Sequence, residues 1–301
     1  MKKIKIGIPR AFLYYQNNIL WKVFFEKINC KVIISPDTND EILNIGTNCT
    51  VKECCLSYKI YFGHALYLSN ICDYILIPKA YNYGKNNNIC PLFNTILDDL
   101  ERYISKSQIL TYNIDYVNFK FEFNELFKIG LKFTKNPIKI IYSYIIAKRK
   151  QKNYDINKQN EQKNKLLKEG PKVLIISKYY NIEDNYIKNK LIPYLDNNNI
   201  ISLYSNNLNK KTAMLFSHYF SNNLSLKNEK QSMGSLYYYK YQIDGIIFIS
   251  VSNCQIEQII NNIAIYQNKN IPFLKYIINE TDQNKKLLDF INIVKYVYSK
   301  K

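Results

Sequence analysis

Three of the seven cysteines stand at the predicted starts of helices, where thiolate chemistry is favoured. Cys55 and Cys254 each directly precede a predicted helix, and Cys90 precedes a proline at the first position of another. Free backbone N–H groups and the positive end of the helix dipole stabilise a thiolate or an anionic cluster at such a position. We therefore single out these three cysteines as candidate metal or redox residues.

The spacing of these thiols does not by itself select one chemistry. Intervals of 35 and 164 residues fit no compact zinc or ferredoxin motif. Cys90 and Cys254 follow predicted strands, one in each half of the chain, and ligands of open α/β sheets bind beyond the carboxyl ends of the strands. We expect the two thiols to face a cleft between the halves, with Cys55 joining from the same side. A metal site, reactive thiols and ordinary packing all remain open at this point.

The other cysteines and the histidines favour structural roles. Cys30 and Cys72 lie beside predicted strands, where a free cysteine behaves as a small apolar residue. Cys54 is expected to pack. His64 falls inside a predicted helix, about 13 Å along the axis from Cys55, so we expect a packed or capping histidine and no Cys-His catalytic pair.

The elements that must position these residues alternate between strand and helix, which predicts α/β lobes with mostly parallel sheets. In the first half we expect strands at 3–8, 32–35 and 73–78, and helices at 11–27, 56–69 and 91–104. In the second half we expect strands at 172–177, 200–204, 245–251 and 272–278, and helices at 182–197, 234–242, 255–267 and 282–298.

The middle of the chain has a different character. Residues 148–169 hold eight Lys or Arg against three acids and few large apolar residues, as in a linker or a solvated helix. A helix on a membrane surface is the alternative. The resulting domains are an N-terminal α/β lobe at 1–115, a helical and basic connecting segment at 116–170, and a C-terminal α/β lobe at 171–301.

The net charge of +18 on 301 residues suits nucleic acid, an anionic membrane or a polyanionic substrate. The lysines are spread along the chain, however, and no helix-turn-helix, zinc-finger or RNP-like pattern occurs. A phosphate-bearing small molecule or an acidic partner protein accounts for the charge equally well. A basic nucleic-acid-binding protein is kept as an alternative.

Several functional classes lack their signatures in this chain. We find no G-x-G-x-x-G, Walker A, G-x-S-x-G or H-E-x-x-H pattern. The longest apolar stretch is far shorter than the roughly 20 residues of a membrane span, and no signal peptide is expected. We therefore expect a cytoplasmic protein, in which disulfides are not expected.

Six segments resemble a known family in order along the chain. They are I-G-I-P-R-A-F-L-Y-Y (6–15), E-C-C-L-S-Y-K-I-Y-F-G-H (53–64), D-Y-I-L-I-P with I-C-P (73–78 and 89–91), Y-N-I-E-D (180–184), D-G-I-I-F-I-S-V-S-N-C (244–254) and I-P-F-L-K-Y-I-I-N-E (271–280). The sequence is similar to the acyl-CoA dehydratase activase-related family, within the 2-hydroxyacyl-CoA dehydratase D-component superfamily, which is 2-hydroxyglutaryl-CoA dehydratase-like.

This resemblance implies two Rossmann-like (flavodoxin-like) lobes with a cleft between them and an oxygen-sensitive [4Fe–4S] cluster. By motif match the cluster ligands are Cys55, Cys90 and Cys254. The resemblance also implies an ATP-dependent activator protein as electron donor, an acyl-CoA or small reducible substrate, and a homo- or heterodimer. The activity implied is that of a 2-hydroxyacyl-CoA dehydratase-like lyase or an ATP-dependent reductase component. Arg10 or Lys59, near the expected cleft, would stabilise an anionic substrate or the cluster, and a plain surface or capping role is the alternative for each.

The chain departs from the family pattern around the expected ligands. The family's Cys-Leu-Pro is Cys-Leu-Ser at 55–57, its late Cys-Gly is Cys-Gln at 254–255, and Ser177-Lys178-Tyr179 replaces a Gly-His. The expected ligands are retained while their neighbours differ. A non-catalytic binding or scaffold subunit that keeps the fold is therefore the alternative to a redox component.

Overall fold

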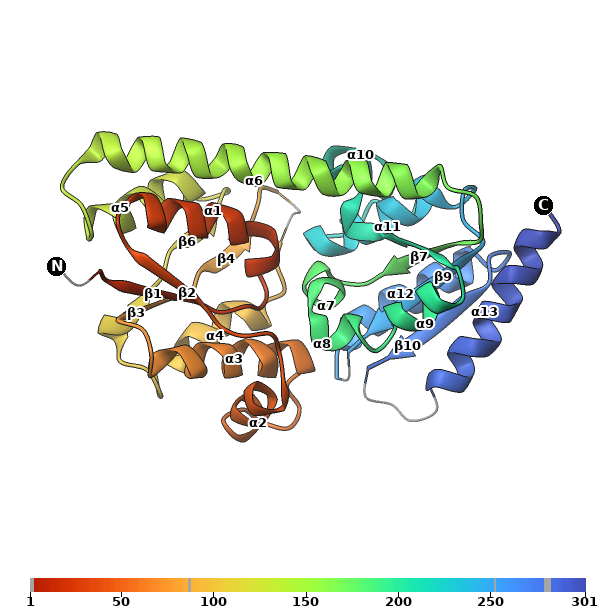
Figure 1. Cartoon of the computed structure of the whole chain (residues 1–301), viewed down its shortest axis with the longest axis horizontal. Helices are drawn as coiled ribbons and strands as arrows, with labels where there is room; N and C mark the ends of the chain where they lie inside the picture. Colours follow the sequence, from red (N-terminus) through yellow and green to blue (C-terminus); the bar gives the residue numbers. More distant parts are fainter. Residues whose placement is uncertain (1–2, 86–87, 252, 279–282) are drawn as a thin grey trace. The chain divides into compact units, whose positions relative to one another are not determined.

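The computed structural model describes residues 3–85, 88–251, 253–278 and 283–301 (Figure 1). The chain divides into two compact units, Met1–Tyr154 and Asp155–Lys301. Each unit holds a four-stranded sheet whose strand pairings are all parallel. This confirms the predicted α/β class with mostly parallel sheets.

The main sheet of unit 1 has the strand order β2-β1-β3-β5. Its strands are β1 (Lys5–Ile8), β2 (Lys31–Ile34), β3 (Tyr74–Leu76) and β5 (Ile109–Leu110). A second, two-stranded parallel sheet pairs β4 (Lys79–Asn82) with β6 (Asn113–Asp115). The short strands β4 to β6 were not predicted, because β4 and β6 mix polar with apolar residues and β5 has only two residues.

The helices of unit 1 follow the predicted sequence of elements. They are α1 (Tyr14–Lys27), α2 (Asp40–Asn48), α3 (Leu56–Ser69), α4 (Leu92–Leu100), the 3₁₀ helix Lys106–Gln108, α5 (Glu122–Leu131) and α6 (Pro137–Leu166). The prediction for α3 is confirmed over its whole length. The basic segment at 148–169 forms the second half of α6, which is one continuous helix across the division between the units (Figure 1).

Unit 2 has the sheet order β10-β9-β7-β8. Its strands are β7 (Lys172–Ile176), β8 (Ile201–Tyr204), β9 (Gly245–Ser250) and β10 (Phe273–Ile277). Every residue of β9 is buried, as expected for a central strand covered on both faces. All four strands were predicted within one or two residues of their observed bounds.

The helices of unit 2 correct two predictions. They are α7 (Tyr179–Glu183), α8 (Asn185–Lys188), α9 (Ile192–Asn197), the 3₁₀ helix Ser205–Asn207, α10 (Lys210–Ser217), α11 (Lys227–Tyr239), α12 (Gln255–Gln267) and α13 (Gln283–Ser299). The single helix expected at 182–197 was wrong, because Asp184 caps a new helix by accepting the Tyr186 N–H and a proline stands in the first turn of α9. Helix α10 was missed, and α11 begins well before the predicted residue 234.

The two units share one topology, which the amino-acid letters do not reveal. In each sheet the first strand lies inside, the second strand lies beyond it at one edge, and the third and fourth strands lie on its other side. A pair of packed helices, α2 with α3 or α10 with α11, joins the second strand to the third. This 2-1-3-4 order is flavodoxin-like and has its switch point between the first and third strands.

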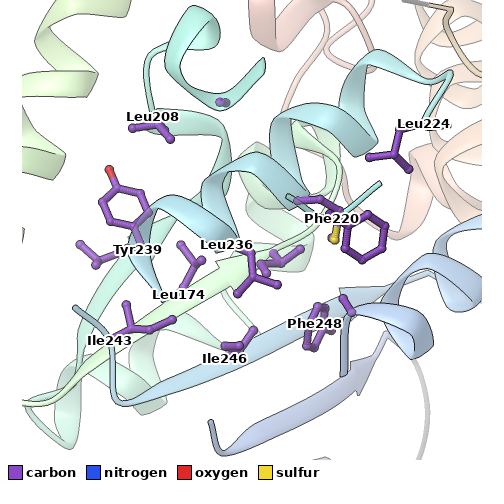
Figure 2. Packing of buried hydrophobic residues seen from close by; sticks show 14 residues of the cluster. Leu174, Leu208, Phe220, Leu224, Leu236, Tyr239, Ile243, Ile246 and Phe248 are labelled. Atoms are coloured by element: carbon purple, nitrogen blue, oxygen red, sulfur yellow. The ribbon is translucent and has the colours of Figure 1, made fainter. Parts of the chain in front are cut away.

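The apolar core of unit 2 shows how the sheet and the helix pair are held together. Leu174 of β7, Phe248 of β9 and Leu236 of α11 belong to one buried cluster (Figure 2). Leu174, Phe248 and Leu236 are fully buried, so truncation of any of them would remove packing that the neighbouring elements share.

Candidate functional site

The carboxyl edge of the unit 1 sheet brings three residues of chemical interest to the switch point. Arg10 follows β1, Cys55 is the N-cap of α3, and Cys90 precedes the N-cap proline of α4. Because the helices of parallel crossovers run back along the strands, their first turns lie at the carboxyl edge. The structure therefore places Cys55 and Cys90 at two helix starts on the ligand-binding side of this sheet.

Local geometry fixes the backbone of Cys55. Its φ and ψ of −65° and 153° are those of an N-cap residue, and its carbonyl accepts the N–H groups of Tyr58 and Lys59 at 3.0 and 3.2 Å. The side chain is buried and makes no capping hydrogen bond to the first turn. The side chain of Cys90 is half-buried, and its carbonyl accepts the Phe93 N–H at 3.1 Å.

Aromatic packing joins the elements that carry these two cysteines. The ring of Phe93, in the first turn of α4, stacks on Phe12 with 3.9 Å between centroids. The same ring lies 6.4 Å from Tyr58 in the first turn of α3. Because Tyr58 and Phe93 each stand three residues after a candidate cysteine, this cluster sets the position of both helix starts within unit 1.

The equivalent edge of unit 2 holds a more densely connected site. Lys178 follows the first strand β7, and its Nζ donates a hydrogen bond to Sγ of Cys254 at 3.0 Å. Cys254 is the N-cap of α12, after the third strand β9. Glu257, in the first turn of α12, accepts hydrogen bonds from Ser177 Oγ at 3.1 Å and from the Val251 N–H at 3.4 Å. Lys178 and Glu257 are only 9% and 6% exposed.

The charges of this buried group follow from their surroundings. Burial raises the pKa of Cys254, and Glu257 raises it further against the opposing effect of Lys178, so Cys254 is a thiol at neutral pH. Burial opposes the charge of Lys178, but Tyr180, Glu257 and Cys254 together raise its pKa well above the ordinary value. An ammonium group is therefore held against a buried sulfur atom, where it would stabilise a thiolate once the proton is displaced.

Glu229, in the first turn of α11, completes the site. Burial raises its pKa to about 7, with Lys178 lowering it and Glu257 raising it. Its Oε1 is buried and has no hydrogen-bond partner within the described parts of the chain. Glu229, Lys178 and Glu257 line a cavity of about 20 Å³, which has room for one water molecule. A carboxyl group that titrates near neutral pH is suited to proton transfer.

The remaining candidates of unit 1 have structural partners. The prediction that His64 is packed is confirmed, since its ring is fully buried and its Nε2 lies 3.0 Å from Thr38 Oγ1. Burial, helped by Arg10, lowers the pKa of His64 to about 3, so it stays neutral. Arg10 forms an ion pair with Asp37, and the Lys59 ammonium donates to a backbone carbonyl at 3.0 Å.

The structure also confirms that two other cysteines are buried packing residues. Cys30 and Cys72 are buried, and burial raises the pKa of each thiol to about 11. Cys54 is half-buried, and burial raises its pKa as well. All seven cysteines lie in the described residues, and each is a free thiol there.

Among the residues whose placement is described, no group of three or more His, Cys, Asp or Glu side chains is arranged to hold a metal ion. The ligand set Cys55, Cys90 and Cys254 therefore stays a prediction, with two members in unit 1 and one in unit 2. Over the described part of the chain, no helix combines the length and apolar character that a membrane span needs.

Comparison with known proteins places this α/β chain in a family. The family model of the CoA enzyme activase uncharacterised domain matches residues 5–208, which include all of unit 1 from β1 onward and the β7 and β8 strands of unit 2. The chain therefore belongs to that family. A comparison with curated proteins found no match.

Sequence reasoning missed the polar partners of Cys254. Ser177-Lys178-Tyr179 was noted only as a departure from a family motif, and Glu229 and Glu257 are ordinary acidic residues in the first turns of helices. The available signal was positional for Lys178 and Glu257, which come soon after the predicted strands at 172–177 and 245–251. Glu229 offered no such signal, because it precedes residue 234, where that helix was predicted to begin. Their convergence needed the strand order, which brings β7 and β9 side by side.

Proposed function

We propose that this protein is a redox component that binds a [4Fe–4S] cluster through Cys55, Cys90 and Cys254 and accepts electrons from an ATP-dependent activator protein. The observation that carries the proposal is the equivalence of two cysteines. Cys254 follows the third strand of the unit 2 sheet and is the N-cap of the next helix, and Cys90 comes after the third strand of the unit 1 sheet and the added strand β4, one residue before the N-cap of the next helix. Membership in a CoA enzyme activase-related family supports it, and we extend the proposal to membership in the D-component superfamily.

The donor chemistry of the three residues fits such a cluster. All three are thiols at helix starts, and iron–sulfur clusters are held by cysteine thiolates. The cluster would supply storage of one electron at a potential that its surroundings set. Lys178 would stabilise the negative charge of the Cys254 sulfur through its hydrogen bond, and the unpaired oxygen of Glu229 would hold a proton close by.

The proposed substrate is an acyl-CoA or a small reducible molecule. A substrate of this kind needs electrons and protons at one site, and Glu229 is a buried carboxyl group beside Lys178 whose pKa is raised to about 7. The competing proposal is a non-catalytic binding subunit, which is favoured by the altered motif at 177–179. The two differ in turnover and not in fold.

Iron and sulfide analysis of protein prepared without oxygen tests cluster binding. We expect about four irons per cluster in the wild type and their loss in Cys55→Ala, Cys90→Ala and Cys254→Ala. The matched control is Cys54→Ala, which removes the neighbouring thiol and should keep its iron. Iron-free wild-type protein, after anaerobic reconstitution with iron and sulfide, would sink the proposal.

Electron transfer separates the two competing proposals. A cluster-loaded sample is mixed with an ATP-hydrolysing activator, and cluster reduction and consumption of an acyl-CoA are followed together. We expect ATP-dependent bleaching of the cluster and turnover of substrate. Bleaching without turnover of any acyl-CoA would favour the non-catalytic subunit.

A further inference from the structure

A pocket of about 150 Å³ lies in unit 2, apart from the site around Cys254. It forms beside Tyr204, the last residue of β8, and is closed by α6, α7 and α8. The carboxyl ends of parallel strands are where α/β proteins bind ligands. The volume is several times that of one water molecule, so the pocket has room for a small anion or a small organic group.

Two ammonium groups share one aromatic ring in this pocket. Nζ of Lys165 lies 5.3 Å from the ring centre of Tyr204, and Nζ of Lys188 lies 5.8 Å from the same centre. Within the described residues, neither lysine forms an ion pair with a carboxylate. Lys165 has only a long hydrogen bond, at 3.4 Å, to a backbone carbonyl. Two like charges thus face one small volume, which a bound anion would neutralise.

Two carboxylates line the pocket, Glu161 and Glu183, and Glu183 is engaged by other partners. Glu183 accepts a hydrogen bond from Lys158 Nζ at 2.7 Å and another from Asn206 Nδ2 at 3.1 Å. Both oxygens of Glu183 are therefore used. This pairing also balances the charge of Lys158. Lys165 and Lys188 are then the pocket lysines without an ion pair in the described residues, although Asp196 and Glu161 act on Lys165 electrostatically.

The floor of the pocket is rigid. The side chain of Gln162 is 1% exposed, donates to the Tyr204 carbonyl at 2.7 Å and accepts the Tyr204 N–H at 2.8 Å. Its amide also donates to the hydroxyl of Tyr239 at 3.2 Å, and Tyr239 belongs to the apolar core (Figure 2). Because Gln162 fixes both backbone groups of Tyr204, the backbone that carries the shared ring is held before any ligand arrives.

The lysines themselves are not ordinary surface residues. Lys165 and Lys188 are both half-buried, whereas most lysines extend into water. Burial lowers the pKa of Lys165, and Lys188 lowers it further against the opposing effects of Asp196 and Glu161. The free pocket therefore holds its charge at a cost that an anionic ligand would relieve.

We propose that the pocket beside Tyr204 binds the phosphate group of a small molecule, with Lys165 and Lys188 as its ligands. A phosphate monoester carries close to two negative charges at neutral pH and offers three acceptor oxygens, so it matches two ammonium groups. A carboxylate carries one charge and would leave one ammonium unpaired. Lysine is a common phosphate ligand in proteins. This site is independent of cluster binding.

Calorimetric titration of the full chain with inorganic phosphate and with pyrophosphate, at constant ionic strength, tests the proposal. We expect saturable binding of one phosphate or pyrophosphate per chain. Lys165→Gln and Lys188→Gln should each weaken pyrophosphate binding by about fivefold or more, and the double variant should abolish it.

Lys240→Gln is the matched control. It removes the same charge from unit 2, and Lys240 also lies over tyrosine rings, at 4.9 and 4.8 Å from two centres, but lines no part of the pocket. The affinity of the Lys240→Gln variant for pyrophosphate should stay within twofold of the wild-type affinity. The proposal is overturned by absence of saturable binding, by equal loss in Lys240→Gln, or by acetate binding as tightly as phosphate. Circular dichroism and thermal unfolding verify that each variant is folded.

Discussion

At the scale of single residues, Lys178 is the group on which the order of the unit 2 site depends. Its ammonium is buried, donates to the Cys254 sulfur at 3.0 Å and lies in the field of Glu257. A buried charge is tolerated where opposite charges and hydrogen bonds replace water. Lys178 and Glu257 therefore stabilise each other, although they approach the site from different elements.

Replacement of Lys178 by methionine tests this interdependence. We expect Lys178→Met to lower the free energy of unfolding by about 1–3 kcal/mol, since the carboxylate of Glu257 loses its balancing charge. Addition of Glu257→Gln to the same chain should recover part of the loss. Denaturant titrations of the two single variants and the double variant measure the coupling, and strict additivity of the losses would contradict it.

Glu229 makes stability depend on pH. Its pKa is raised from 4.5 to about 7 in the folded chain, so the folded state binds a proton that the unfolded state releases near pH 4.5. The stabilisation is present below pH 4.5 and is lost as pH rises to about 7. At pH 8 the free energy of unfolding of Glu229→Gln should therefore exceed that of the wild type by about 1–3 kcal/mol. At pH 4.5 the two should differ little. Denaturant titrations at both pH values measure the difference.

The control for Glu229 is Glu26→Gln, which removes an exposed carboxylate of α1. This variant should follow the wild type within about 0.5 kcal/mol at both pH values. If Glu229→Gln raised the free energy of unfolding equally at pH 4.5 and pH 8, the stability difference at this position would come from the shape of the side chain and not from its charge.

At the scale of elements, two helix pairs are packed with their backbones in contact. A Cβ added at Gly46 of α2 would lie 1.9 Å from the carbonyl oxygen of Lys59 in α3. A Cβ at Gly234 of α11 would lie 1.8 Å from the carbonyl oxygen of Ala213 in α10. The helix pair between the second and third strands is thus closely packed through a glycine in both units.

Gly46→Ala and Gly234→Ala should each destabilise the chain by about 3 kcal/mol or more, because a backbone carbonyl cannot move aside without separating the two helices. The control is Asn44→Ala, at an exposed position of α2, which should change stability little because alanine favours helix. Urea unfolding measures all three. If both glycine variants lost less than about 1 kcal/mol of unfolding free energy, the two helices of each pair could move apart at little cost.

The elements could be predicted where a period was long enough to detect. Helices α3 and α12 were predicted at their observed bounds, because apolar residues recur over 14 and 13 residues. Apolar periodicity did not predict the helices after β7, since these helices are only four to six residues long. Local capping residues decide where each of them begins. Cys55, Cys90 and Cys254 could be placed at helix starts, but Lys178, Glu229 and Glu257 could not be grouped without the strand order.

At the scale of the whole molecule, the chain holds two versions of one architecture with different side chains at equivalent places. Arg10 and Lys178 follow the first strands, and Cys55 and Glu229 stand at the starts of the helices before the third strands. Only the residue type at the start of the following helix is kept, as Cys90 and Cys254. The two units therefore share a strand order although their side chains at equivalent positions differ. Packing constrains the path of the chain more strongly than it constrains the residue types at the edge of the sheet.

Since each unit contains its own sheet and its own buried residues, we expect them to respond separately to a local loss of packing. Leu236 of α11 is fully buried in the unit 2 cluster, so Leu236→Ala should cost about 2–5 kcal/mol. Hydrogen exchange followed by mass spectrometry should then show faster exchange in β7, β8 and β9, while β1, β2 and β3 keep wild-type protection. Equal acceleration in both sheets would mean that the units unfold as one, in which case their shared helix α6 transmits the loss.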